Sequence, residues 1–264
     1  MRTYITIAVI GIVLFVLSGV GVCGVYKLRE AGARTSCRNN LHQLAITIAN
    51  YEATYLRYPQ ATIPNDALPP QERLSWLVDI LPFVESDARY STFDLKKGWQ
   101  VPHNQIPGAG CLYYLLCPSG NFSSRTNVTD YVGLSGIGPD AALLPKESPR
   151  AGMFGFERTI TKKDITDGSS TTILATETAV NNGPWAAGGP ATVRYLDPND
   201  QPYIGIDRPF GRLHGAQPWS GFTSPITQAV FVDGHVGRIG PDIDPRVFEA
   251  LVTIAGGEQV PDEY

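Results

Sequence analysis

The sequence predicts an α+β fold, in which one long N-terminal helix precedes a loop-rich domain that contains β-strands. A helical pattern without an internal proline extends over residues 4–58. The chain has 27 Gly and 21 Pro and only 17% charged residues, which is typical of loops and strands rather than of a helical bundle. Near the C-terminus, two β-type runs flank Asp233–Gly234. We expect an anchor over residues 1–30 and a globular domain over residues 31–264.

Residues 4–26 contain no charged side chain. About 20 apolar residues are enough to cross the hydrocarbon core of a bilayer as a helix. The sequence therefore predicts a single-pass protein of the cytoplasmic membrane, anchored through residues 4–26. Three alternatives remain: a cleaved signal peptide, whose apolar region is usually shorter; a lipoprotein site at Cys23, which the bulky Val22 disfavours; and a buried core helix.

The helix is expected to continue beyond the anchor as an amphipathic segment. Apolar side chains recur there at steps of three and four, as on one face of a helix: Cys37, Leu41, Leu44, Ile48, Tyr51 and Tyr55. Because proline cannot continue a helix, Pro59 should end it at about residue 58. We expect this stripe to pack against the globular domain.

The net charge and the cysteines limit the possible binding partners, disulfides and metal sites. The net charge of −4 provides no basic surface of the kind that binds nucleic acid, so no nucleic-acid partner is expected. Of the four cysteines, Cys37 and Cys117 could form a disulfide that closes a loop of about 80 residues and stabilises the fold by ~4 kcal/mol. The alternative is that Cys37, Cys111 and Cys117 are buried free thiols. No Cys/His spacing fits a structural zinc site.

The first half of the domain is predicted to contain short elements. Residues 76–85 have the spacing of a short helix, with Ser75 as N-cap and Pro82 as an interruption. Residues 112–116 form an apolar run that predicts a buried strand, whereas residues 99–110 show no regular pattern.

The second half is predicted to supply most of the sheet. Residues 129–133 and 191–196 have the composition of strands. Residues 133–138 are expected to be a glycine-rich loop, which lacks the Lys-Ser/Thr of a phosphate-binding loop. Residues 183–190 are expected to form an exposed loop, and residues 244–251 a closing helix.

Two Asp-Gly dipeptides are the clearest local signals. Asp233–Gly234 lies between residues 229–232 and 235–239, which predicts a hairpin with a two-residue type I′ turn. Asp167–Gly168 predicts a turn before a strand that ends at Glu177.

The same region contains the only metal candidates, the carboxylates of Asp164, Asp167 and Glu177. Calcium prefers several oxygen ligands, but the spacing is not that of an EF-hand loop. A turn with capping carboxylates explains these residues without a metal. We expect no cofactor, with calcium as the alternative.

A catalytic constellation is not expected. His214 and His235 with Asp233 and a serine would be needed for a triad, yet Ser135 lies in Gly-Leu-Ser-Gly, which is not a nucleophile elbow. We therefore expect no catalytic residues and a protein that is not an enzyme.

Several short motifs occur in a fixed order along the chain: Cys37–Leu44, Tyr58–Pro59, Ser75–Glu85, Cys117–Ser119, Asp130–Gly133, Gly152–Phe154, Asp164–Ile173 and the Asp233–Gly234 hairpin. Their order and number resemble a large family of prepilin-like, membrane-anchored proteins expanded in planctomycete bacteria. The domain of that family has no established function and is sometimes labelled solute-binding-like. Its motif positions here are Asn40, Trp76, Pro82, Asp167, Gly168, Glu177, His214, Asp233 and Gly234.

The resemblance implies a pilin-like fold, in which the second half of the long helix packs on an antiparallel sheet with long loops. It also implies an envelope location and pilin-like or type II secretion partners. This sequence departs from the family because Met1–Tyr4 contain no glycine cleavage site and no glutamate follows early in the helix. His214 also lies further before Asp233 than in the family pattern.

Two arguments predict opposite membrane topologies, that is, opposite sides of the membrane for the globular domain. Basic residues that follow the apolar segment, such as Arg29, Arg34 and Arg38, would keep the domain cytoplasmic by the positive-inside rule. The resemblance places the domain outside the membrane, and we follow the resemblance.

Two functions are consistent with the sequence. The first is a non-enzymatic, pseudopilin-like envelope protein with a secretion or pilus-type assembly role. The second is an envelope binding module for a glycan, peptide or small solute, with ligand loops near Trp99, Trp185 and Trp219. A pocket lined by two of these tryptophans would favour binding, whereas a smooth loop surface would favour assembly.

Overall fold

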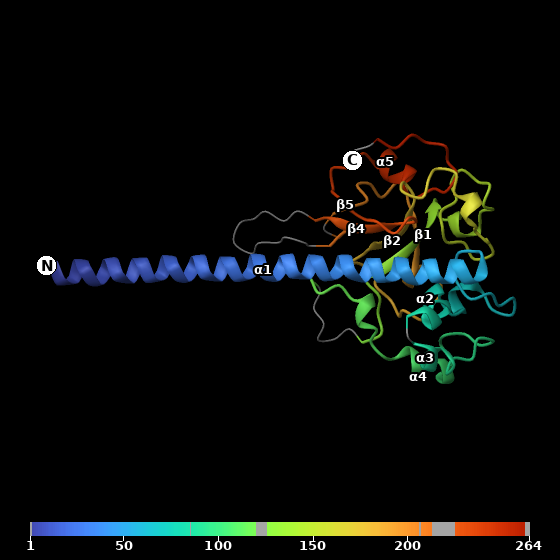
Figure 1. Cartoon of the computed structure of the whole chain (residues 1–264), viewed down its shortest axis with the longest axis horizontal. Helices are drawn as coiled ribbons and strands as arrows, with labels where there is room; N and C mark the ends of the chain where they lie inside the picture. The colour runs from blue at the N-terminus through green and yellow to red at the C-terminus, as the bar shows by residue number, and fades with distance from the viewer. Residues whose placement is uncertain (1, 85, 120–125, 206, 213–224, 262–264) are drawn as a thin grey trace.

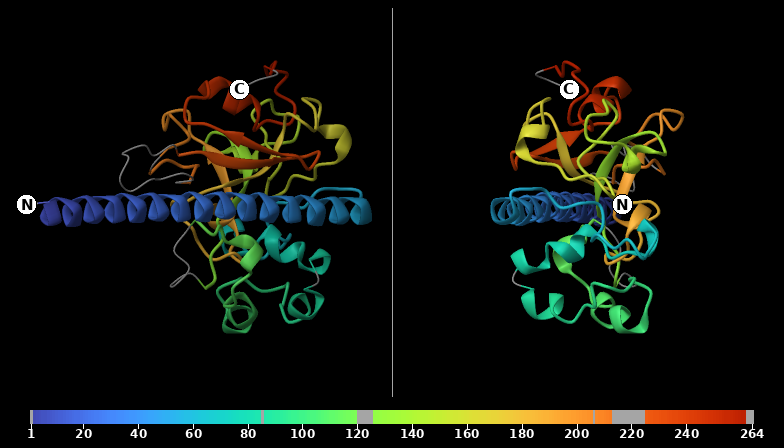
Figure 2. Two further views of the ribbon diagram at one scale, coloured as in Figure 1. Left: turned by 60° about the vertical axis from the view of Figure 1, so that its left-hand side comes forward. Right: turned by 90° about the vertical axis from the view of Figure 1, so that its right-hand side faces the viewer.

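The long helix α1 runs between two layers of the molecule (Figure 1). The computed structural model describes residues 2–84, 86–119, 126–205, 207–212 and 225–261, without the side chains of residues 2–23, 26 and 27. On one side of α1 lies a sheet with helix α5, and on the other side lie the short helices α2 to α4 (Figures 1 and 2). The N-terminal half of α1 projects away from both layers, so only its second half belongs to the globular part.

Helix α1 spans Arg2–Tyr55 and confirms the predicted amphipathic stripe. Cys37, Leu41, Leu44, Ile48 and Tyr51 are all fully buried in its second half. Tyr55, the last residue of the predicted stripe, is 52% exposed, because the helix ends there. Leu56 turns the backbone into the left-handed region with φ 56°, so the helix ends slightly earlier than Pro59 alone would require.

The predicted anchor lies mostly outside the described side chains, which begin at residue 24. Within the part of the chain that the structure describes, no helix combines the length and the hydropathy needed to cross a bilayer.

The sheet has five strands in the order β3-β1-β2-β4-β5. The strands are β1 (Tyr131–Ile137), β2 (Ile173–Glu177), β3 (Val193–Leu196), β4 (Thr227–Phe231) and β5 (Val236–Ile239). The prediction of an antiparallel sheet is wrong at one edge, because β3 pairs with β1 in parallel. The chain reverses direction after β2, and β3 then adds to the far side of β1, which runs in the same direction as β3.

Of the residues 133–138 that were expected to form a loop, 133–137 belong to β1, which ends at Ile137. The small residues are needed there because Phe154 lies against the strand: a Cβ on Gly133 would lie 2.4 Å from Cδ2 of the Phe154 ring. Phe154 in turn packs on the buried Trp76, with ring centroids 4.8 Å apart. Glycine therefore marks close packing in this strand rather than a turn.

Hydrophobic clusters cover both faces of the sheet. The larger cluster joins the stripe of α1, Trp76 and the side chains around Phe154. The second cluster lies beneath α5 (Pro245–Ala250), whose Phe248 is fully buried. The carboxylate of Asp244 caps this helix by accepting from Arg246 N at 2.8 Å, which confirms the predicted closing helix.

The layer opposite the sheet differs most from the prediction. Residues 76–85 contain α2 (Trp76–Asp79) and a 3-10 turn at Leu81–Phe83, rather than one helix. Residues 112–116 are not a strand but include a 3-10 turn at Tyr113–Leu115. Helix α3 (Asp87–Tyr90) follows the first of these segments.

Helix α4 (Pro102–Gly108) lies within the segment for which no regular pattern was expected. The buried Asn104 explains its position, because its amide donates to the carbonyls of Asp94, Lys97 and Gly98 at 3.0 to 3.2 Å. A single polar side chain thus organises a segment that has little apolar periodicity.

The β4–β5 hairpin is confirmed, but its predicted type I′ turn is wrong. Gly234 N donates to Phe231 O at 2.9 Å, and Phe231 N donates to His235 O at 3.0 Å. This pattern encloses a three-residue loop, in which Gly234 has φ 92° and Asp233 has no positive φ. A type I′ turn needs positive φ at both central residues, whereas a three-residue loop needs it only at the glycine.

Candidate functional site

A buried polar cluster lies where α1 enters the globular part. Cys37 on α1 and Cys117 before β1 form a disulfide with their Cα atoms 5.1 Å apart. One helical turn further, Asn40 donates to Leu116 O at 2.9 Å and to the Tyr131 hydroxyl at 3.2 Å. The helix is therefore joined to the sheet covalently and by hydrogen bonds at the same level.

The centre of the cluster is an ion pair between Asp130 and Arg212. Their side chains are 0% and 6% exposed, and the nitrogen and oxygen lie 2.5 Å apart. Asp130 also accepts from Cys117 N at 2.8 Å and from the Asn182 amide at 2.5 Å, while Arg212 donates to Thr178 O at 3.0 Å. Such additional hydrogen bonds are needed to offset the cost of removing two charges from water.

Glu177 lies in the same cluster and is fully buried at the end of β2. Gln228 N donates to its Oε2 at 3.0 Å, and the Gln228 amide in turn donates to Arg34 O on α1 at 3.3 Å. Burial, with the nearby charge of Glu177, raises the pKa of the Tyr131 phenol well above its ordinary value, so this hydroxyl stays protonated. The cluster is a set of mutual donors and acceptors rather than an open active site.

The cluster also contains the one potential metal-ligand group among the described residues, the sulfurs of Cys37 and Cys117 with a carboxylate oxygen of Glu177, all within 4.8 Å. The sulfurs are bonded to each other, and a metal ligand must be a thiolate. The group therefore does not hold a metal in the oxidised protein.

The predicted calcium ligands do not gather in the structure. Asp164 pairs with Lys146 at 2.7 Å and accepts from Thr161 in a capping box. Asp167 accepts from the backbone of Gly256 and Gly257 at 2.7 and 2.9 Å, and so fastens the C-terminal segment. Gly168 follows with φ 105°, as a turn residue should. Each carboxylate has a separate structural partner.

Of the three tryptophans predicted near ligand loops, Trp99 and Trp185 lie within the described residues and each donates to a backbone carbonyl. Trp185 is fully buried and donates from Nε1 to Gly110 O at 3.0 Å, so the loop expected to be exposed is largely interior. Trp99 is half-buried and donates to Gln71 O at 2.9 Å. Trp219 lies outside the described residues. The motif residue Trp76 is buried and donates to Thr192 O at 3.0 Å, and Pro82 lies within the 3-10 turn.

Among the residues considered for a triad, the described ones have separate partners. His214 lies outside the described residues. His235 stacks on Phe231 and lies 2.7 Å from Asp233 through Nδ1, on an exposed turn. The Ser135 hydroxyl donates to Arg194 O at 3.2 Å.

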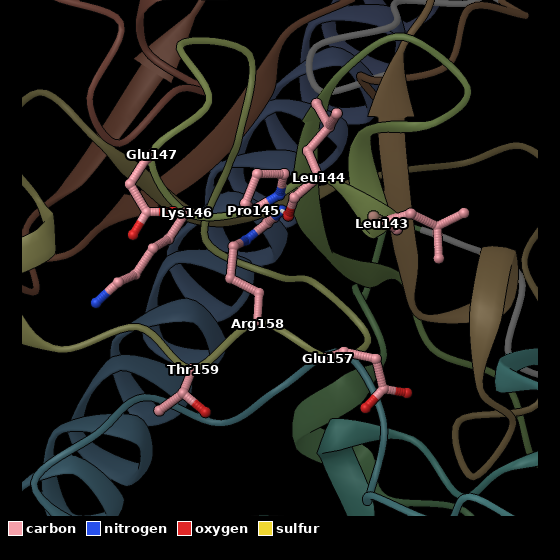
Figure 3. A pocket seen from close by; sticks show the side chains of 9 residues that line it. Leu143, Leu144, Pro145, Lys146, Glu147, Glu157, Arg158 and Thr159 are labelled. Carbon is pink, nitrogen blue, oxygen red and sulfur yellow. Dashed lines mark hydrogen bonds between the residues drawn. The ribbon is translucent and has the colours of Figure 1, made fainter.

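A pocket of about 460 Å³ lies beside residues 142–147 and 157–159 (Figure 3). Arg158 stands in its centre, with Lys146 and Glu147 on one side and Leu143 and Glu157 on the other (Figure 3). Lys146 is already paired with Asp164, and Glu157 with Arg73.

Arg158 is the feature of this pocket that the sequence did not reveal. Its guanidinium donates at 2.6 to 3.0 Å to backbone carbonyls of four residues, Ser135, Ala141, Leu144 and Gly152. No described carboxylate pairs with it, and burial lowers its pKa to about 10. Arg158 thus joins β1 to two loops, and no local sequence pattern signals carbonyl partners so far apart in the chain.

A protein-family model described as "Protein of unknown function (DUF1559)" matches residues 27–246. This match confirms the part of the resemblance that concerned a domain without an established function. No curated protein and no solved structure significantly matches the chain.

Proposed function

The chain belongs to the family of proteins of unknown function DUF1559, and within that family we propose that it is a non-enzymatic, pseudopilin-like envelope protein. In this proposal residues 4–26 anchor the chain in the cytoplasmic membrane, the globular domain is extracytoplasmic, and α1 mediates association between copies or with secretion-type partners. The observation that carries the proposal is the geometry of α1, whose first half projects from the domain while its second half is built into it (Figure 1).

The exposed face of the second half supports an association role. Opposite the buried stripe, a set of outward residues follows the helical period: Asn39, Gln43, Ile46, Asn50 and Ala53. These side chains are uncharged, so another helix could pack against this face without burying a charge. Ile46 is 57% exposed at the centre of this face and provides an apolar contact point.

The buried cluster supports the same proposal from the other side of the helix. A helix that connects a membrane anchor to a domain needs a fixed position relative to the sheet of that domain. The Cys37–Cys117 disulfide and the Asn40 hydrogen bonds fix its position along its axis. The disulfide also favours an oxidising compartment, in agreement with an extracytoplasmic domain.

The test is cross-linking of copies in membranes. Cys23 and Cys111 are first replaced by serine, and cysteine is then introduced as Ile46→Cys or, as the matched control, as Leu143→Cys, which is 70% exposed on another face. We expect oxidised dimers from Ile46→Cys and only background from Leu143→Cys, with the protein retained in the membrane after carbonate washing. Release by carbonate would overturn the anchor, and equal cross-linking at both positions would overturn the role of α1.

A further inference from the structure

A second pocket, of about 510 Å³, lies beside the edge strand β3. It is formed by β3, the loop that follows β2 and the segment before Pro209. Its volume is within the range of small-molecule sites, which combine an apolar surface with a few placed polar groups. We propose that this pocket binds a neutral oligosaccharide, a function beyond the assembly role and independent of it.

The apolar surface is provided by Tyr195. Its side chain is 42% exposed, on the strand that forms the edge of the sheet. A tyrosine ring presents a flat apolar face with a polar tip, and so suits a ligand that is apolar on one face and hydroxylated at its rim. A pyranose ring has this character, because its axial C–H groups form an apolar face and its hydroxyls surround it.

The polar groups are mainly hydrogen-bond acceptors. Asp197 and Asp207 line the pocket. Oδ1 of Asp197 accepts from the backbone and the side-chain amide of Asn199 at 3.0 Å, which leaves its Oδ2 for a ligand, whereas Asp207 has no hydrogen bond or ion pair with any described residue. Asn181 is exposed at the same pocket and can both donate and accept. Sugar hydroxyls donate well to carboxylates, so these groups suit a ligand with several hydroxyls.

A metal ion does not explain these carboxylates. No group of three acidic, cysteine or histidine ligands in the described chain includes Asp197, Asp200 or Asp207. The three aspartates therefore do not come together as a three-ligand metal group, and they can act as separate acceptors for donors at several positions of one ligand.

Charge selects a neutral ligand. Arg194 lines the pocket, held by Thr178 Oγ1 at 2.6 Å and by backbone carbonyls that include Val180 O at 2.6 Å. No described carboxylate forms an ion pair with it, so its charge disfavours a cationic ligand. Asp197 and Asp207 at the same pocket disfavour an anionic ligand, and the third carboxylate of the lining, Asp200, is paired with Arg208 at 3.0 Å. An uncharged polyhydroxylated chain avoids both penalties.

The test uses the full chain in micelles of lauryldimethylamine oxide, a detergent without a sugar headgroup. Saturation-transfer NMR is recorded with cellohexaose, maltohexaose and chitohexaose as probes. We expect saturation transfer to at least one of them, and loss of roughly tenfold in affinity in Tyr195→Ala, the effect of losing one aromatic contact. Asp207→Asn should weaken binding by a smaller factor.

The matched control is Tyr113→Ala, which removes a tyrosine that is 80% exposed outside the pocket and should leave binding unchanged. Absence of transfer to all three probes overturns the proposal, as does binding that Tyr195→Ala leaves intact. Stronger binding of hexagalacturonate or of a hexalysine peptide would also overturn it, because either would show that charge rather than hydroxyls is recognised. None of these outcomes affects the cross-linking test of α1.

Discussion

Arg212 and Arg158 are both buried beside β1, but they are stabilised in different ways. Arg212 pairs with the carboxylate of Asp130 inside the polar cluster under α1. Among the described residues, Arg158 has only backbone carbonyls as partners, and burial lowers its pKa to about 10. The ion pair is a contact between two side chains, to which Arg212 adds a hydrogen bond to Thr178 O. The carbonyl contacts of Arg158 tie three separate backbone segments together.

The two kinds of partner predict different losses of stability when each arginine is replaced. Removing one partner of a buried ion pair leaves an uncompensated charge, and removing both partners can be nearly neutral. When an arginine that donates to backbone carbonyls is removed, no second substitution can compensate, because the carbonyls belong to the backbone and cannot be removed as well. The Asp130–Arg212 pair should therefore be replaceable as a unit, and Arg158 should not be.

The largest expected effect is that of Arg158→Met. Four carbonyls lose a charged donor, although Ser135 O still accepts from Gly152 N and Ala141 O from Leu144 N. Hydrogen bonds to charged groups contribute about 1.5–3 kcal/mol each, so we expect a loss of at least ~4 kcal/mol in the free energy of unfolding. Urea unfolding of the full chain, followed by tryptophan fluorescence, measures it. Arg246→Met, at a side chain that is 86% exposed, should leave the midpoint unchanged. An equally stable Arg158→Met variant would show that water replaces the guanidinium in the pocket.

Asp130→Asn should have the next largest effect. It leaves the charge of Arg212 buried without its partner, which costs about 3–5 kcal/mol in comparable sites. The double variant Asp130→Asn/Arg212→Met should regain most of that loss, because no uncompensated charge remains. The same unfolding measurement on both variants decides the point. If the double variant is as unstable as the single one, the pair is not a separable unit and the comparison with Arg158 fails.

The smallest expected effect concerns pH and the carboxylate near the Arg158 pocket. Burial raises the pKa of Asp164, but hydrogen bonds from Lys146 and Thr161 outweigh it and hold the pKa below its ordinary value. The folded state then binds fewer protons than the unfolded state at acid pH, so this contribution is present above about pH 4 and is lost as the pH falls through the lowered pKa.

Asp164→Asn should therefore reduce the fall in stability on acidification, measured as the urea midpoint between pH 5 and pH 2.5. Asp66→Asn, at an exposed carboxylate, provides the matched control and should reproduce the slope of the original protein. Identical slopes for Asp164→Asn and the original protein would exclude a role of Asp164 in acid stability.

Local patterns predicted part of the fold and little of the site. The stripe from Cys37 to Tyr51, the β4–β5 hairpin and α5 follow from periodicity, an Asp-Gly dipeptide and a capping aspartate, which act over a few residues. The parallel edge strand β3 could not be read in this way, because pairing depends on where the chain returns after β2. The loop predicted over residues 133–138 is mostly strand, and the sequence does not show this because the contact of Gly133 with Phe154 is remote along the chain.

In the candidate site, too, the sequence indicated some of the residues but not their partners. Asn40, Glu177 and Asp167 were singled out by their motifs, but their partners Tyr131, Gln228 and the backbone at Gly256 became known only from the structure. The prediction of an exposed loop around Trp185 is wrong, because an aromatic residue in a Gly/Pro-rich segment has the same sequence pattern whether the segment is exposed or folded inward. Burial of Trp185 depends on Phe93 and on Gly110 O, which lie far away in the chain.

The sequence by itself determined the long helix, its buried stripe, the α+β class and membership of a family with a recognisable order of motifs. These properties depend on periodicity and on residues that act on their immediate neighbours. The strand order, the partners of Arg158 and Arg212, and the pocket at Tyr195 can be seen only in the folded structure. The reason is physical: a buried charge needs partners wherever the folded backbone supplies them, and their distance along the chain is not encoded in any local pattern.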